Sequence, residues 1–293
     1  MPAVTPALLR RMPLPRLDDR GDKEDRGRVL VLGGALEMPG ALVLAGIAAL
    51  RAGAGKLQLA TCRSIAPLVG IAVPEARVVR LDETPAGGIS SSAAAQVVAL
   101  AEKANALLIG PGMMDPGAVS DLVRKVLAEV RGPTVVLDAE AMSVLAAHRG
   151  ALHALGGRAV ITPHAGEMAS LLGIDKDEVS GSPLAIALRA AAELRCVVAL
   201  KGSETFVASQ EGDVYRYAAG GVGLATSGSG DTLAGIVAGL AARDTDPLRA
   251  ALWGVALHGA AGNTLARRMG PVGFLARELL DEIPKELRRL DGR

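Results

Sequence analysis

The chain has 293 residues, half of them hydrophobic, and its 32 Lys and Arg side chains nearly balance its 31 Asp and Glu, for a net charge of +1. Neither this charge nor the five aromatic residues favours nucleic-acid binding, and no apolar run is long enough to cross a membrane, so we expect a cytoplasmic protein with small-molecule partners. The two distant cysteines, Cys62 and Cys196, lack the spacing of a disulfide framework or a zinc site.

The chain begins with a segment rich in Pro, Arg and Asp. We expect residues 1–26 to be loosely ordered and residues 27–293 to form a single domain. From residue 28, short β-branched or Leu-rich runs alternate with Ala-rich segments of helical periodicity. The runs predict strands over 28–34, 56–61, 106–112, 134–139, 158–163 and 196–202, and the Ala-rich segments predict helices over 40–53, 117–130 and 182–194.

This alternation predicts the fold class. Strands that are apolar throughout and separated by helices are typical of parallel sheets buried on both faces. Near residue 210 the pattern changes, because ETFVAS and VYRYAA flank the turn sequence QEGD (210–213), which indicates a hairpin. We therefore predict an α/β protein with a mainly parallel central sheet, helices on both faces, a small antiparallel extension and a mostly helical last third.

Several predicted strands end in residues suited to a binding site. In open α/β sheets, ligands bind outside the carboxyl ends of the strands. The ends in question are Gly33-Gly34, Gly110-Pro111-Gly112, Asp138, Thr162-Pro163-His164 and Lys201-Gly202. We expect these ends to line one crevice.

The stretch TSGSGDTLAGIVAGL (226–240) places one carboxylate, Asp231, behind a loop of small residues. Glycines let the backbone approach a ligand closely, and the N–H groups at a helix start favour an anion. This predicts an anion cradle over residues 228–230, with Asp231 as the base that takes a proton from a hydroxyl attacking a phosphoryl group. The alternative is that Asp231 is only the N-cap of the helix.

The stretch ITPHAGEMASLLG (161–173) holds a second pair of candidates. Pro163 and Gly166 fix a turn after a strand, so we expect His164 and Glu167 to be exposed near the carboxyl edge of the sheet. His164 is either a ligand contact or a structural residue. Glu167 either holds Mg²⁺ through water or stabilises the helix dipole.

Taken together, these residues resemble the ADP-dependent NAD(P)H-hydrate dehydratase family, a branch of the ribokinase-like superfamily. The PHxGE segment combined with KGxxT and GSGD is more specific than the glycine motifs, which sugar and vitamin kinases share. The motifs occur in the family's order between about residues 26 and 283: GRVLVLGG, PGALVLAGIAALRAGAG, LLIGPGM, VVLDAEAM, ITPHAGEMASLLG, LKGSETFVAS and TSGSGDTLAGIVAGL. The resemblance implies a ribokinase-like catalytic domain over residues 27–293.

The resemblance also implies an activity and a set of site residues. A member of this family is a hydro-lyase that removes water from the S epimer of hydrated NADH or NADPH, with ADP consumed to AMP and phosphate and with Mg²⁺ as cofactor. Phosphorylation of the C6 hydroxyl followed by elimination is the expected chemistry. By motif matching, the hydrated nucleotide contacts Ala41, Gly112, His164 and Asp231. The adenine nucleotide is held by Lys201, Gly202, Ser203, Glu204, Thr205, Gly228, Ser229 and Gly230.

Some features of the chain differ from the family pattern or leave alternatives open. A Tyr is common in the family where this chain has Met38, so that substrate contact differs. Only 26 residues precede the fold, so we expect a monofunctional chain without the N-terminal epimerase domain of some members. We also expect the chain to form a homo-oligomer. A vitamin-precursor kinase that uses ATP would share the fold and the glycine loop, and a non-catalytic nucleotide sensor would share the pocket but would need no base.

Overall fold

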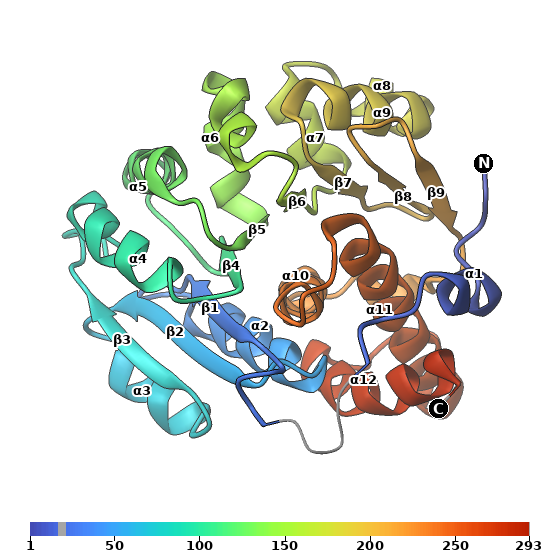
Figure 1. The fold of residues 1–293 in the computed structure, drawn as a ribbon, viewed down its shortest axis with the longest axis horizontal. Helices are drawn as coiled ribbons and strands as arrows, with labels where there is room; N and C mark the ends of the chain where they lie inside the picture. Colours follow the sequence, from blue (N-terminus) through green and yellow to red (C-terminus); the bar gives the residue numbers. More distant parts are fainter. Residues whose placement is uncertain (17–21, 293) are drawn as a thin grey trace.

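A single sheet forms the centre of the structure. The computed structural model describes residues 1–16 and 22–292, and within these ranges nine strands pair in the order β3-β2-β1-β4-β5-β6-β7-β8-β9 (Figure 1). Neighbours from β3 to β7 run parallel, whereas β7, β8 and β9 pair antiparallel, which confirms the predicted fold class. The strands are β1 (Arg28–Leu32), β2 (Lys56–Cys62), β3 (Arg77–Leu81), β4 (Ala106–Ile109), β5 (Thr134–Leu137), β6 (Ala159–Ile161), β7 (Val197–Leu200), β8 (Thr205–Ala208) and β9 (Val214–Tyr217).

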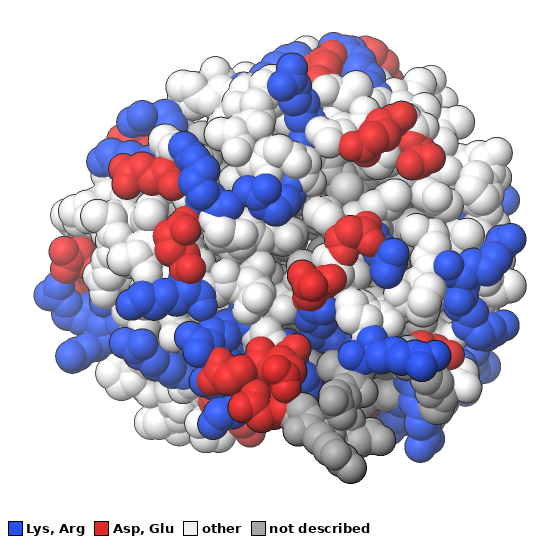
Figure 2. Space-filling model, in the orientation of Figure 1, with Lys and Arg blue, Asp and Glu red and all other residues white. Residues whose placement is uncertain are grey.

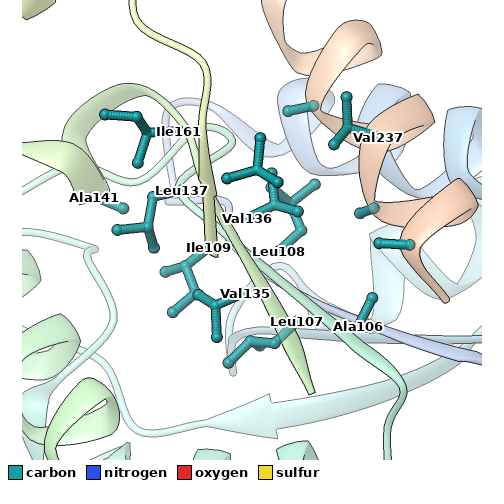
Figure 3. Packing of buried hydrophobic residues seen from close by; sticks show 14 of the residues in the cluster. Ala106, Leu107, Leu108, Ile109, Val135, Val136, Leu137, Ala141, Ile161 and Val237 are labelled. Carbon is teal, nitrogen blue, oxygen red and sulfur yellow. The ribbon is translucent and has the colours of Figure 1, made fainter. Parts of the chain in front are cut away.

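The central strands are buried on both faces. Leu107, Leu108 and Ile109 of β4 are fully inaccessible to solvent. Because successive side chains of a strand point to opposite faces, such a strand needs cover on both sides. Figure 3 shows the result, with side chains of β4 and β5 packed together and Val237 of the neighbouring helix facing them.

Two helical layers supply this cover (Figure 1). On one face, α10 packs on β4 and β5 and α11 packs on β6 to β8, with α2, α3 and α12 beside them. On the other face, α4 packs on β1 and α9 packs on β7 and β8. The helices are α2 (Pro39–Arg51), α3 (Ala66–Ala72), α4 (Ala94–Ala101), α5 (Pro116–Glu129), α6 (Val144–Ala147), α7 (Ala165–Leu172), α8 (Lys176–Gly181), α9 (Pro183–Leu194), α10 (Ser229–Ala241), α11 (Pro247–Met269) and α12 (Ala276–Asp291), with 3₁₀ turns η1 (Ser91–Ala93), η2 (Ala139–Ser143), η3 (Arg149–Leu155) and η4 (Val222–Leu224).

Helix α10 lies in the middle of the molecule (Figure 1). From Thr232 to Ala241 all of its residues are buried, so it needs neighbours on every side. Gly235 and Gly239 allow α2 to come close, because a Cβ at these positions would lie 2.2 Å from the carbonyl oxygen of Ala45 and 2.4 Å from that of Ala49. The packing fixes the position of the N-terminus of α10.

The sequence patterns did not predict β3 and extended several strands too far. In β3, Arg77 and Arg80 are exposed while Val79 and Leu81 are buried, which is the pattern of an edge strand rather than of an apolar run. The strand predicted over 106–112 ends at Ile109, because Gly110 has a φ of 132° and turns the chain.

The predicted loose attachment of residues 1–26 is wrong for residues 1–16. Helix α1 (Pro6–Arg11) buries Leu9, which is 1% exposed, and Ala3 pairs with Arg216 at the free edge of β9. Trp253 Nε1 of α11 donates a hydrogen bond to the carbonyl oxygen of Met12 at 2.8 Å. The Pro-rich composition did not show that neighbouring elements bind the backbone of this segment. Residues 17–21 and 293 lie outside the described residues, and the domain boundary at residue 27 stays a prediction.

The surface carries charges of both signs. Lys and Arg side chains are interspersed with Asp and Glu on the face shown in Figure 2, as expected from their near-equal numbers. None of the helices in the described ranges combines the length and apolar character of a membrane crossing. The homo-oligomeric state and the cytoplasmic location stay predictions.

Candidate active site

The strand order reverses between β1 and β4, which are neighbours although β2 and β3 separate them in the chain. Such a switch point opens a crevice at the carboxyl ends of the two strands. Here Gly34 N donates to the carbonyl oxygen of Pro111 at 2.7 Å. Gly112 has a φ of 67°, and a Cβ on it would lie 2.9 Å from the Cβ of Ala41. The structure therefore brings Ala41 and Gly112 into contact at the switch point.

The N-terminus of α10 differs from one of the two sequence-based interpretations. Gly228, with a φ of 84°, is the N-cap, and Asp231 is the third residue of the helix. The interpretation of Asp231 as the cap is therefore wrong. Ser229 N donates to the carbonyl oxygen of Thr226 at 3.2 Å, but Gly228, as the N-cap, has no side chain to cap the other N–H groups of the first turn. These N–H groups can bind an anion.

Four charged side chains converge in front of this helix, and we call them the charged cluster: Asp138, Glu167, Lys201 and Asp231. Lys201 Nζ lies 3.2 Å from Asp138 Oδ1 and 3.9 Å from Glu167 Oε2. Thr162 Oγ1 donates to the same Asp138 oxygen at 2.6 Å. A Cβ on Gly230 would lie 3.4 Å from Lys201 Nζ, so the lysine head group lies beside the start of α10.

The charged cluster changes the acidity of its members. Burial and the charge of Asp138 raise the pKa of Asp231 to about 6, although Lys201 opposes this shift. Burial acts to lower the pKa of Lys201, but the carboxylates of Asp138, Glu167 and Asp231 together outweigh it and raise that pKa. At neutral pH the cluster therefore contains a lysine cation and, in Asp231, an ionised carboxylate that is a better base than an ordinary aspartate.

His164 and Glu167 form a capping box at the start of α7. His164 Nδ1 accepts hydrogen bonds from the N–H groups of Gly166 and Glu167 at 3.0 and 3.1 Å. Glu167 Oε2 accepts in return from His164 N at 2.8 Å. The His164 side chain is 60% exposed and the Glu167 side chain 23% exposed, so the predicted exposure holds for His164 and only in part for Glu167. Both residues have a structural role, and both remain accessible to a ligand.

A cavity of about 650 Å³ lies beside the charged cluster. Six residues predicted for the adenine nucleotide line it, and so does His164, which was predicted on the substrate side. Apolar residues line part of the remaining wall, including Val222, Leu224, Leu233 and Val255. The six predicted residues are Lys201, Gly202, Ser203, Thr205, Ser229 and Gly230.

The other predicted residues lie outside this lining. The carboxylate of Glu204 pairs with Arg216 at 3.1 Å. Gly228 faces α2, since a Cβ on it would lie 2.5 Å from Leu44. Ala41 and Gly112 lie at the switch point described above, and Asp231 follows directly after the lining residue Gly230.

Two residues beside the site received no role from the sequence. Asp138 was noted only as the end of a strand, because its partner Lys201 is 63 residues away. His258 of α11 lines the cavity, and its Nε2 lies 2.8 Å from Ser229 Oγ. The available signals were an acidic residue after a buried strand and a single histidine in an apolar helix. Neither signal specifies a partner.

The site can be tested for its fit to Mg²⁺. Across residues 1–16 and 22–292, no three His, Cys, Asp or Glu side chains are grouped as a metal cage. Mg²⁺ in phosphoryl-transfer sites commonly uses one or two carboxylates together with phosphates and water. Glu167 and Asp138, which Lys201 links, fit that donor set.

The chain is similar to known proteins of one family. A family model described as NAD(P)H-hydrate dehydratase matches residues 29–285. The chain is 50% identical over 288 residues to the ADP-dependent (S)-NAD(P)H-hydrate dehydratase of Xanthomonas campestris pv. campestris, covering 98% of this chain and 96% of that one. The ADP/ATP-dependent NAD(P)H-hydrate dehydratase from Bacillus subtilis, co-crystallized with ATP/Mg²⁺, is similar at a TM-score of 0.81 and 31% identity, over 99% and 98% of the two chains. A ribokinase-like superfamily protein from Enterococcus faecalis V583 is similar at a TM-score of 0.85 and 25% identity, over 99% of this chain and 96% of that one. This similarity confirms the predicted fold.

Proposed function

Because the chain belongs to the NAD(P)H-hydrate dehydratase family, as its motifs predicted, we propose that it removes water from the S epimer of hydrated NADH and NADPH while converting ADP to AMP and phosphate. The observation that carries this proposal is the position of Asp231. Its carboxylate lies at the head of a buried helix, beside Lys201 and directly after two residues that line the cavity. A base and a phosphate-binding cation are thus adjacent.

The reaction proceeds in two steps. Asp231 takes the proton of the C6 hydroxyl as its oxygen attacks the β-phosphorus of ADP, so that an O–P bond forms and the bond to AMP breaks. The C6–O bond then breaks, phosphate leaves, and loss of a proton from C5 restores the ring double bond. With a pKa of about 6, Asp231 is mostly ionised at neutral pH and strong enough to share the proton in the transition state.

The remaining site residues hold the two nucleotides. Lys201, which stays protonated, and the free N–H groups at the start of α10 bind the phosphates of ADP. The apolar wall of the cavity accepts the base, and Ala41 and Gly112 border the hydrated ring at the switch point. Mg²⁺, held by Glu167 and Asp138 together with the phosphates, would neutralise charge on the transferred group.

The products decide between this function and the kinase alternative. We expect the purified chain, given the S epimer of hydrated NADH, Mg²⁺ and ADP, to form NADH, AMP and free phosphate in equal amounts. Recovery of the dihydronicotinamide absorbance measures NADH, chromatography of the nucleotides measures AMP, and a colorimetric assay measures free phosphate. An ATP-dependent kinase would instead accumulate a stable phosphorylated product. If the chain forms no AMP from ADP with either hydrate, that of NADH or that of NADPH, the proposal is contradicted.

A further inference from the structure

The wall that α11 contributes to the cavity contains one polar side chain. Three α11 residues line the cavity, Val255, His258 and Gly259, and His258 alone among them can form a side-chain hydrogen bond. Its Nε2 lies 2.8 Å from the hydroxyl oxygen of Ser229. Ser229 is the first residue of α10, is 4% exposed and also lines the cavity. The pair thus joins the cavity wall contributed by α11 to the start of α10.

The environment keeps the His258 ring neutral. Burial and the nearby Lys201 cation lower the pKa of His258 to about 4. A neutral imidazole has one N–H donor and one acceptor nitrogen. The contact with Ser229 can therefore run in either of two directions. Either Nε2–H donates to the Ser229 oxygen, or the Ser229 hydroxyl donates to Nε2.

The direction determines what Ser229 offers to the cavity. When Nε2–H donates, the Ser229 hydroxyl proton stays free to point at a ligand. When the hydroxyl donates to the ring, that proton is used and oxygen lone pairs face the cavity. The next residue along α10, Gly230, lies beside the Lys201 cation, and the helix start adds free N–H groups, so the ligand at this point is an anion. An anion binds a donated proton and repels lone pairs, so it favours the first direction.

We propose that His258 is a positioning residue whose Nε2–H donates to Ser229 Oγ and thereby directs the Ser229 hydroxyl proton to a phosphate of the bound adenine nucleotide. This inference rests on the proposed function, since it takes ADP as the ligand. His258 acts on the phosphate only through Ser229. Replacement of either residue alone should therefore weaken ADP binding as much as replacement of both.

A double-mutant cycle tests this dependence. Titration calorimetry measures the Kd of Mg²⁺-ADP for the full chain and for His258→Leu, Ser229→Ala and the double variant. We expect each single substitution to raise Kd about tenfold, the loss of one charge-assisted hydrogen bond, and the double variant to show the same tenfold change. His258→Gln, which keeps an N–H donor, should recover part of the affinity. His153→Leu is the matched control, because His153 also bonds through Nε2, at 3.0 Å to the Glu193 carbonyl oxygen, and lies outside the cavity lining. It should leave Kd unchanged.

Nitrogen NMR on the unmodified chain adds a test that needs no variant. We expect His258, one of four histidines, to carry its proton on Nε2 when ADP is bound. A proton on Nδ1, an unchanged Kd in His258→Leu, or a roughly hundredfold rise in the double variant would each overturn the inference, the last by showing that the residues act separately. If the unmodified chain binds no ADP, the proposed function fails, and this inference fails with it.

Discussion

Replacement of Asp231 by Asn separates catalysis from folding at the head of α10. The substitution keeps the shape of the side chain and removes the negative charge and the basic oxygen. If Asp231 takes the hydroxyl proton during phosphoryl transfer, the loss falls on the transition state rather than on binding. We expect kcat to fall by about 10²–10⁴-fold, which corresponds to roughly 3–5 kcal/mol of barrier, while ADP still binds.

The same substitution should stabilise the protein. The pKa of Asp231 is about 6 in the folded protein and 3.8 for an ordinary aspartate, so its ionisation is harder in the folded state. Below pH 3.8 the carboxyl is protonated in both the folded and the unfolded state, so it does not reduce the free energy of unfolding. Between pH 3.8 and 6 a penalty develops, and above pH 6 it reaches roughly 3 kcal/mol. Asn removes this penalty and loses a smaller helix-dipole contribution, so we expect a gain of about 1–3 kcal/mol at neutral pH.

Two measurements on one protein preparation check the prediction. Turnover is followed by AMP formation, and the free energy of unfolding by urea titration at pH 7.5. Asp177→Asn is the matched control, because Asp177 is also a first-turn aspartate, on α8, but is exposed at the surface. It should change neither quantity. Near-normal turnover of Asp231→Asn, or its clear destabilisation, would refute the reasoning about this carboxylate.

Four further predictions follow from the same geometry. In the unmodified chain, log(kcat/KM) for the hydrate should fall with unit slope below pH 6, because Asp231 of the free enzyme must be ionised to accept a proton; a kcat/KM that is flat down to pH 5 would exclude Asp231 as the base. His164→Ala should raise the KM for the hydrate more than that for ADP and, by loss of the cap, lower stability by about 1 kcal/mol, whereas His164→Ser should restore stability alone. Gly202→Val should weaken ADP binding at least about tenfold in calorimetry without unfolding the chain, since Gly202 lines the cavity and a Cβ there would lie 3.1 Å from the carbonyl oxygen of Glu204, which must shift slightly; Gly117→Val, where a Cβ has no neighbour within 4 Å, is the control. Leu9→Ala should cost about 2–5 kcal/mol in urea unfolding, and a cost below 1 kcal/mol would mean that the N-terminal segment contributes little.

Much of the fold was predictable because its signals are local. The apolar runs that became β1, β4, β5 and β7 are continuous, and the Ala-rich periodicity of α2, α5 and α9 lies within single segments. The edge strand β3 escaped because its alternating Arg and apolar residues resemble a surface segment when read alone. The position of residues 1–16 depends on contacts with β9 and α11, which are more than 200 residues away in the chain.

In the candidate site, too, local motifs were predictable from the sequence and contacts between distant residues were not. The glycine loop and Asp231 form one contiguous motif, so their importance was visible in the sequence. The helix start was misplaced by three residues, because a left-handed Gly228 takes the cap position in place of a polar side chain. The pairing of Lys201 with Asp138, and of His258 with Ser229, joins residues from different elements. Only the folded sheet reveals such pairs.

In the proposed mechanism the C6 hydroxyl attacks ADP before water is lost, and an isotope label distinguishes this order from direct loss of the hydroxyl. Hydrated NADH carrying ¹⁸O at the C6 hydroxyl is incubated with the enzyme, ADP and Mg²⁺, and the phosphate is analysed by mass spectrometry. Because the attacking oxygen forms the new O–P bond and its bond to C6 then breaks, each phosphate released should contain one ¹⁸O atom. Unlabelled phosphate, with the ¹⁸O found in water, would show that the hydroxyl leaves without being phosphorylated and would contradict the role assigned to Asp231.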